Sequence, residues 1–243
     1  EVIVYFPTCP FAPFRRLSKA INYLRAMARG YRIVRSDMGR PAVCHANVLT
    51  RSALLPFMLH VAHHIPYVIT EHWSRYLPQN FSYTGWLRRR VTERVVSRAA
   101  CVLTVSHQLA SAMQQHHLHN DNYRIVHNVV DDFFYQPQSL PLATPKRIIH
   151  ISCFDEKAKN ICGMLRAIDH LRHERDDFEV IIVGTGVDYH YVTDYAARLG
   201  LTDQYVRFVG EKTPREVRDL FDTSVVLLLF SNYENAPVVI SEA

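Results

Sequence analysis

Residues 178–186 read FEVIIVGTG, a short apolar run with four consecutive β-branched side chains that ends in Gly184-x-Gly186. An apolar run without polar alternation is typical of a strand that is buried on both faces. The two glycines allow a tight turn and a close backbone approach before the next helix. The chain has only 8 glycines in 243 residues, so this pair carries weight, although the rest of the dinucleotide-binding fingerprint is absent.

The same pattern recurs along the chain, where apolar runs alternate with longer stretches of helical period. Such alternation predicts an α/β protein whose parallel sheets are covered by helices on both faces. Strands are expected at Val2–Phe6, Ala42–Cys44, Tyr67–Thr70, Cys101–Val105, Tyr123–Val126, Arg147–Ser152, Phe178–Val183, Tyr205–Val209 and Val225–Phe230. Helices are expected at Leu17–Ala28, Leu49–His63, Trp86–Ser97, Gln108–His116, Cys162–Arg172, Tyr189–Leu199 and Pro214–Phe221.

Residues 136–145 (QPQSLPLATP) interrupt this alternation with three prolines. Such a segment cannot form a helix interior or a central strand, so it is expected to be a linker. We therefore divide the chain into two α/β domains, residues 1–140 and 141–243. The formal charge reverses near residue 100 and follows this boundary only loosely: residues 1–100 carry +11 and residues 101–243 carry −6.

Composition excludes several classes of protein. Hydrophobic residues make up 48% of the chain and charged residues 21%, which excludes disordered, collagen-like and coiled-coil chains. No apolar run approaches the roughly 18–20 residues that span a bilayer. The five cysteines form no C-x-x-C pair, so buried, reduced thiols in a cytoplasmic protein are expected rather than disulfides or a zinc site.

Both ends of the chain lie within expected core elements. Glu1 directly precedes an apolar run, and Ala243 falls inside an expected helix. Complete domains rarely begin and end in this way, so we expect a fragment truncated at both ends. A fragment of this kind is expected to be a poor enzyme on its own.

Ligands of open α/β sheets bind beyond the carboxyl ends of the strands, so polar side chains that follow the strands are the candidate site residues. Residues 231–243 (SNYENAPVVISEA) bring Glu234 to the end of the last strand. Pro237 suits the first helical position, which places Glu242 near the start of that helix. A carboxylate beside free helical N–H groups suits neutral hydroxyls such as a ribose diol. A surface loop with two solvated acids is an equally good interpretation.

Two further strand ends carry candidate residues. Residues 155–160 (DEKAKN) bear two lysines, and Lys159 could reach a diphosphate, although a solvated loop is the better interpretation of this segment alone. Glu71, His72 and Trp73 follow the strand at 67–70 and fit either a polar pocket or a structural hydrogen-bonded pair. Ser106 is expected to cap the helix that follows the strand at 101–105.

Histidine and arginine clusters have simpler explanations. His60, His63 and His64, like the cluster at 116–119, have helical metal-ligand spacing but no acid or cysteine companion, so no metal site is expected. Basic side chains gather in two expected helices of the first domain, at Arg15, Arg16, Lys19, Arg25, Arg29, Arg88, Arg89, Arg90, Arg94 and Arg98. They form a solvated face or a surface that attracts anionic lipid headgroups or nucleic acid.

Taken in order, these segments resemble the GT-B glycosyltransferases, specifically family 4, the retaining enzymes that use nucleotide-sugars. The most specific match is Ser231-x-x-Glu234-x-x-Pro237-x-x-x-x-Glu242-Ala243, which resembles the family's paired-glutamate motif. The matching segments that precede it in the chain are 65–72, 105–106, 125–131, 155–160 and 183–186. The resemblance implies two Rossmann-like parallel-sheet domains that face a cleft, the acceptor-side domain at 1–140 and the donor domain at 141–243.

The resemblance also implies a role for each site residue. Glu242 would bind the ribose hydroxyls, and Lys159 would neutralise the leaving diphosphate. Glu234 would contact the donor sugar, while His72 would lie over it from the acceptor domain. The remaining nucleotide-sugar contacts are implied at Gly184, Gly186, Asn235, Ala236, Pro237 and Val238. No metal and no permanently bound cofactor is implied, and the donor substrate is a UDP- or GDP-sugar.

The chain departs from the family pattern at several positions. Ser152-Cys153 stands where the family has Gly-Arg, so one diphosphate contact is missing or is replaced by Lys157. His127 and Val129 replace the common proline and glycine, and the family's N-terminal glycine-rich loop is absent.

The expected function is therefore sugar transfer to a glycan or lipid-linked acceptor in cell-surface polysaccharide synthesis. The expected location is the cytoplasm, at the inner face of the membrane, where the basic helices contact anionic lipid; a nucleic-acid partner is not expected, because the basic segments lack interleaved exposed aromatic residues and a known nucleic-acid motif. The alternatives are another GT-B enzyme, such as a sugar-nucleotide 2-epimerase, and a basic non-enzymatic module that binds membrane or nucleic acid.

Overall fold

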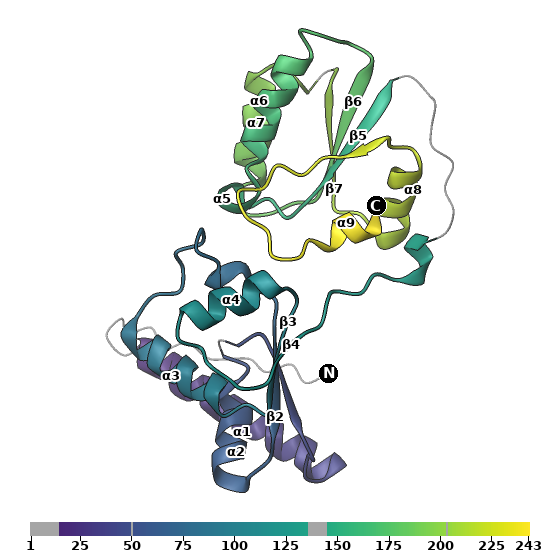
Figure 1. Ribbon diagram of the computed structural model, residues 1–243. Helices are drawn as coiled ribbons and strands as arrows, with labels where there is room; N and C mark the ends of the chain where they lie inside the picture. Colours follow the sequence, from purple (N-terminus) through teal and green to yellow (C-terminus); the bar gives the residue numbers. More distant parts are fainter. Residues whose placement is uncertain (1–14, 50, 136–144, 203) are drawn as a thin grey trace. The chain divides into compact units, whose positions relative to one another are not determined.

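The computed structural model describes residues 15–49, 51–135, 145–202 and 204–243. It divides into two compact units, each built on its own sheet (Figure 1). Unit 1 runs to Trp73 and from Tyr83 to Val126; unit 2 comprises residues 74–82 and the chain from His127 onward. The expected strand Val2–Phe6, and all of the expected linker except Pro145, lie outside the described residues.

Unit 1 contains a four-stranded parallel sheet in the order β1-β2-β3-β4. Parallel neighbours need crossover connections, and helices supply them here. The strands are β1 (Cys44–Asn47), β2 (Tyr67–Glu71), β3 (Cys101–Thr104) and β4 (Tyr123–Ile125). The helices are α1 (Arg15–Met38), α2 (Leu54–His63), α3 (Trp86–Ser97) and α4 (His107–Gln115). As expected, Ser106 caps α4, because its Oγ accepts a hydrogen bond from Leu109 N at 3.1 Å.

Unit 2 contains a second four-stranded parallel sheet, in the order β7-β6-β5-β8. Its strands are β5 (Lys146–Ile151), β6 (Phe178–Val183), β7 (Val206–Gly210) and β8 (Val226–Leu227). Its helical segments are η2 (Ser74–Tyr76), η3 (Asp132–Tyr135), α5 (Glu156–Lys159), α6 (Ile161–Leu171), α7 (Tyr189–Arg198), α8 (Pro214–Asp222) and α9 (Val238–Glu242). The chain builds outward from β5 to β7 and then returns through α8 to place β8 on the other side of β5. The strand order therefore reverses between β5 and β8, which is where open α/β sheets bind ligands.

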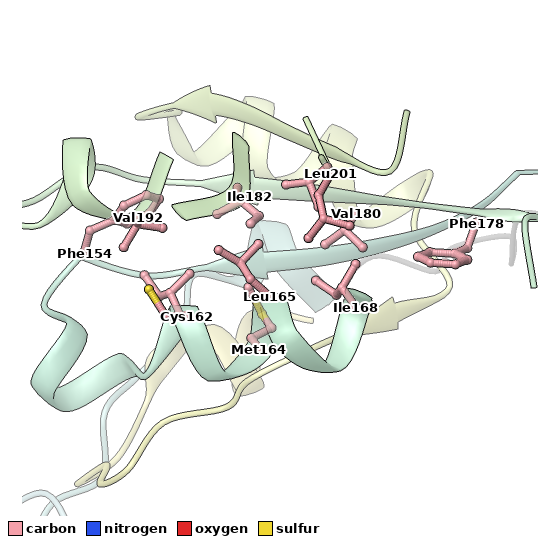
Figure 2. Close-up of a cluster of buried hydrophobic side chains, with 13 residues drawn as sticks. Phe154, Cys162, Met164, Leu165, Ile168, Phe178, Val180, Ile182, Val192 and Leu201 are labelled. Atoms are coloured by element: carbon pink, nitrogen blue, oxygen red, sulfur yellow. The ribbon is translucent and has the colours of Figure 1, made fainter. Parts of the chain in front are cut away.

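Strand β6 explains why its sequence lacks polar alternation. Successive side chains of a strand point to opposite faces, and both faces of β6 are covered. Val180 and Ile182 belong to a core shared with α6 and α7, whereas Ile181 and Val183 belong to a second core shared with α8 and η3. Figure 2 shows the first core, in which side chains of α6 lie against those of the sheet.

Several elements differ in length from the expectation. The first helix continues to Met38 instead of ending at Ala28, and β1 begins at Cys44 rather than Ala42. Strand β8 ends at Leu227 instead of Phe230, so a longer segment is left to form the loop that carries Glu234. Pro237 precedes α9 as its N-cap residue with φ −69° and ψ 114°, one position earlier than expected.

Candidate active site

The candidate site of unit 2 is centred on Lys159 and Glu234, which follow the two strands that flank the reversal of strand order. Lys159 ends α5, just after β5, and Glu234 lies in the loop after β8. The Lys159 Nζ lies 2.5 Å from Glu234 Oε1, and the two side chains are 22% and 26% exposed. Ser231 Oγ donates a second hydrogen bond to the same carboxylate oxygen at 2.7 Å. The two charged residues proposed from separate segments of sequence therefore meet.

The Glu234 loop is held against α5 by its own backbone and side chains. Asn232 N donates to Ala158 O at 2.8 Å, and Asn232 Nδ2 donates to Lys157 O at 3.0 Å. Farther along the loop, Ala236 O accepts a hydrogen bond from Asn128 Nδ2 at 2.9 Å. These contacts define the path of the backbone on either side of Asn235.

The remaining residues of the paired-glutamate motif lie on or beside α9. Pro237 is half-buried and Val238 is exposed at the start of this short helix. Glu242 ends the helix and is half-buried, and burial raises the pKa of its carboxyl group. A carboxylate in this environment has lost part of its hydration, which favours hydrogen bonds from neutral hydroxyls.

Gly184 and Gly186 allow β6 to approach the loop after β5 closely. A Cβ at Gly184 would collide with Ser152 O, and one at Gly186 would lie 2.5 Å from Phe154 O. Gly184 also has φ +121°, a conformation that L side chains rarely adopt. Phe154 N donates to Thr185 O at 2.8 Å, which joins the two loops. The geometry thus explains both glycines by packing, and their contact with a nucleotide remains a prediction.

The position where the family has arginine offers no cation here. Cys153 is exposed and uncharged in the loop after β5. Lys157 does not point at the Lys159–Glu234 pair: its Nζ donates to Asn80 O at 3.0 Å, within the segment 74–82 of unit 2. Beneath this loop lies His150, a fully buried imidazole on β5 that the sequence did not single out. The signal was present, because this histidine interrupts the isoleucines of the strand, at 148, 149 and 151.

In unit 1, Glu71 and His72 lie at the carboxyl end of β2. The Glu71 carboxylate is 1% exposed and accepts hydrogen bonds from the backbone N–H groups of Leu49, His72 and Trp73, at 2.9, 3.0 and 2.8 Å. Burial raises the pKa of Glu71, and the three N–H donors oppose that shift. The His72 side chain is exposed. Glu71 therefore organises the loop, whereas His72 presents its imidazole to solvent.

The histidine and cysteine side chains that the structure describes form no cluster suited to a metal. Within the described residues, no group of three His, Cys, Asp or Glu side chains comes together. His60 Nδ1 is instead within 3.2 Å of Ile65 O, a structural contact. Of the four cysteines described, all are free and Cys162 is the buried one; Cys153 is exposed, because it lies in the loop beyond β5. The expectation of uniformly buried thiols was therefore wrong.

Helix α3 of unit 1 combines arginines with exposed apolar side chains. Trp86 is 77% exposed and Leu87 is 61% exposed in its first turn, directly before Arg88-Arg89-Arg90. The expectation that the basic segments lack exposed aromatic residues was therefore wrong. Arg90 lies 4.0 Å from Glu93, at the limit of an ion pair. In the part of the chain that the structure describes, no helix is both long and apolar enough to cross a membrane.

Comparisons with known proteins agree with the two-unit architecture. The family model of the glycosyl transferase 4-like domain matches residues 3–129, and that of the glycosyl transferases group 1 matches residues 132–243. Sucrose-phosphate synthase from Thermosynechococcus elongatus superposes with a TM-score of 0.77 at 16% identity, over 98% of this chain and 62% of that one. Alr3699/HepE from Anabaena, solved with UDP and glucose, gives 0.71 at 19% identity, over 98% and 63%. No curated protein matches the sequence.

A third structure, the lipopolysaccharide outer core galactosyltransferase WaaB, superposes with a TM-score of 0.62 at 15% identity, over 93% of this chain and 59% of that one. At such identities the superpositions establish the fold, which is that of the GT-B glycosyltransferases. The chain belongs to the glycosyl transferase 4-like family, with a group 1 glycosyl transferase domain in its second half. It spans 62% of the length of the sucrose-phosphate synthase chain.

Proposed function

We propose that the protein transfers a sugar from a UDP- or GDP-sugar to a glycan or lipid-linked acceptor, with retention of configuration, in the synthesis of cell-surface polysaccharide. The observation that carries this proposal is the Lys159–Glu234 pair, which flanks the reversal of strand order in a chain of glycosyltransferase family. The UDP and glucose bound by the Anabaena relative support a UDP-sugar as donor.

The proposed roles follow from charge. Cleavage of the donor leaves negative charge on the diphosphate, and Lys159 is placed to stabilise it. Glu234 is an acceptor for donor-sugar hydroxyls, and the half-buried Glu242 is an acceptor for the ribose diol. His72 lies over the donor sugar from the acceptor-side domain. The proposed bounds are residues 1–140 for the acceptor-side domain and 141–243 for the donor domain.

Isothermal titration with UDP, GDP and their sugars tests the donor assignment. We expect one nucleotide series to bind and Glu242→Ala to weaken it by about tenfold, the loss of a hydrogen bond to a charged group. The control is Glu211→Ala, an exposed acid in the loop before α8. Binding by none of these ligands, or unchanged turnover in Glu242→Ala, contradicts the proposal. Conversion of the donor sugar without any acceptor would instead identify a 2-epimerase.

We further propose that unit 1 docks on an anionic membrane through α3, which places the enzyme in the cytoplasm at the inner face. Exposed Trp86 and Leu87 beside three arginines suit the boundary between headgroups and acyl chains. Co-sedimentation with vesicles of anionic and of neutral lipid tests this, with Trp86→Ala and Arg90→Glu as variants. Equal binding to both vesicles would remove the electrostatic component. Salt-sensitive binding of nucleic acid without vesicle binding would favour the non-enzymatic alternative.

A further inference from the structure

His150 is a buried polar residue that the proposed chemistry does not use. It lies on β5 with no exposed surface, between the apolar residues Ile149 and Ile151. Its Nδ1 is 2.8 Å from Leu228 O, and its Nε2 is 2.7 Å from Ser152 Oγ. A buried imidazole with a partner for each nitrogen is fully satisfied, so its place in the strand has a structural reason.

The partners determine where the proton of the neutral ring lies. A backbone carbonyl only accepts hydrogen bonds, so Nδ1 must carry the proton that Leu228 O receives. Nε2 is then the acceptor, and the Ser152 hydroxyl donates to it. Burial lowers the pKa of His150, which favours this neutral form.

Leu228 marks the point where the Glu234 loop leaves the sheet. The β5–β8 ladder pairs Ile149 with Leu227, and Leu228 N, one residue after the end of β8, donates to Ile149 O at 2.8 Å. The imidazole of His150 donates a hydrogen bond to the carbonyl of this same residue. Three residues later, Ser231 begins the hydrogen bonds that hold Glu234.

The other partner, Ser152, begins the loop that leads to Lys159. Its backbone is confined by neighbouring β6, because Gly184 abuts Ser152 O and Ser152 N donates to Val183 O at 3.2 Å. Ser152 replaces the glycine of the family pattern, so its hydroxyl and the bond to His150 belong to this chain's version of the loop.

We infer that His150 is a positioning residue that holds together the starts of the two loops carrying Lys159 and Glu234. Through Leu228 it determines where the Glu234 loop leaves the sheet, and through Ser152 it orients the loop before α5. Its consequence for donor binding rests on the proposed function, whereas the coupling of the two loops does not.

The first test measures the loop and the ring directly in the full chain. Hydrogen exchange of peptides covering 228–236 is compared between wild type, His150→Leu and His150→Asn, whose amide N–H can still reach Leu228 O. We expect exchange about tenfold faster in His150→Leu, the equivalent of one buried hydrogen bond, and near wild-type exchange in His150→Asn. The matched control is His170→Asn, since His170 is exposed on α6. Equal exchange in all four proteins overturns the inference.

NMR of histidine-labelled protein identifies the tautomer, with the His150 signal assigned by its loss in His150→Asn. We expect a proton on Nδ1 in wild type, and an Nε2 shift in Ser152→Ala with the Nδ1 proton retained. A proton on Nε2 instead would overturn the assignment. If His150→Leu fails to fold, Ser152→Ala removes the other hydrogen bond of His150, and exchange is then measured in peptides covering 152–160; unchanged exchange there overturns the inference.

The second test asks whether the coupling matters to the donor. UDP-sugar turnover should show a lower kcat in His150→Leu, because Glu234 is displaced, and His150→Asn should restore most of it. Normal turnover in His150→Leu would overturn the role in donor binding. If wild type neither binds nor turns over any nucleotide-sugar, the proposed function fails, while the exchange and tautomer measurements still decide the role of His150.

Discussion

The ion pair between Lys159 and Glu234 makes an unusual prediction: removing the glutamate charge should strengthen the binding of a nucleoside diphosphate. Lys159 Nζ is paired with Glu234 Oε1 at 2.5 Å. A diphosphate that recruits Lys159 must therefore compete with that carboxylate. Glu234→Gln keeps an oxygen that can accept from Lys159 and Ser231 but removes the charge that holds the lysine.

The magnitude follows from the environment of the pair. With side chains 22% and 26% exposed, the pair is more buried than the surface ion pairs that contribute about 0.2–1 kcal/mol. Hydrogen bonds to charged groups contribute about 1.5–3 kcal/mol. Part of that bond survives with glutamine, so we assign about 1 kcal/mol to the charge. Because the diphosphate no longer has to break this interaction, UDP or GDP should bind more favourably by the same free energy, which corresponds to about fivefold tighter binding.

The assay is titration calorimetry of wild type, Glu234→Gln and Lys159→Met with the nucleoside diphosphate that binds wild type. Glu216→Gln is the matched control, because Glu216 on α8 lies 3.0 Å from Lys212 and glutamine preserves its place in the capping box. The reasoning is refuted if Glu234→Gln binds no more tightly than wild type while Lys159→Met binds more weakly. Sugar transfer should fall in Glu234→Gln even as the affinity for the diphosphate rises.

Three other predictions concern stability in thermal or urea unfolding. Gly184→Ala should lower the free energy of unfolding by about 2–4 kcal/mol, because its Cβ would collide with Ser152 O at a positive φ. The control, Gly30→Ala in α1, should raise the free energy of unfolding by about 1 kcal/mol. Equal effects of the two substitutions would contradict the packing role of Gly184. Because the folded-state pKa of His150 lies below its ordinary value of 6.5, the unfolded chain binds the proton more readily and stability falls as the pH drops from 7 toward 5. Comparing wild type with His150→Asn should show a shallower fall in the variant, and parallel curves would contradict this. Thr213→Ala removes the capping box of α8 and should cost about 1 kcal/mol, with Thr213→Ser retaining it.

Elements that are specified by their own stretch of sequence could be predicted. Strand β6 reads as buried because its side chains alternate between two cores, and that requirement is visible as an unbroken β-branched run. The position of Lys159 and Glu234 beyond the carboxyl ends of strands could also be predicted, because each residue follows an apolar run; their pairing as a site came from the resemblance, since the residues alone fitted solvated loops.

Elements that depend on distant neighbours could not be predicted in the same way. Residues 225–230 are apolar throughout, so the sequence does not indicate where β8 ends. Its end at Leu227 depends on the pairing with β5. The proposed role of His150 depends on its hydrogen bond to Leu228 O, which is 78 residues away in the chain. Helix α1 continues through Gly30, a residue that locally disfavours a helix, so its length was underestimated.

The departures from the family pattern at Ser152 and Cys153 have a common consequence. The family's arginine is replaced by an uncharged thiol, and Lys157 donates to Asn80 O, so the proposed diphosphate contact depends on Lys159. The formal charge of residues 101–243 is −6, which offers no general attraction to phosphate. The proposed affinity for phosphate must then come from a local site, Lys159 and the helix starts, and the position of Lys159 depends on the loop that Ser152 begins. A site that relies on Lys159 gains from a rigid loop, because a displaced lysine would lose its contact with the diphosphate. We infer that the hydrogen bond between Ser152 and His150 supplies that rigidity, at the position where the family has Gly-Arg.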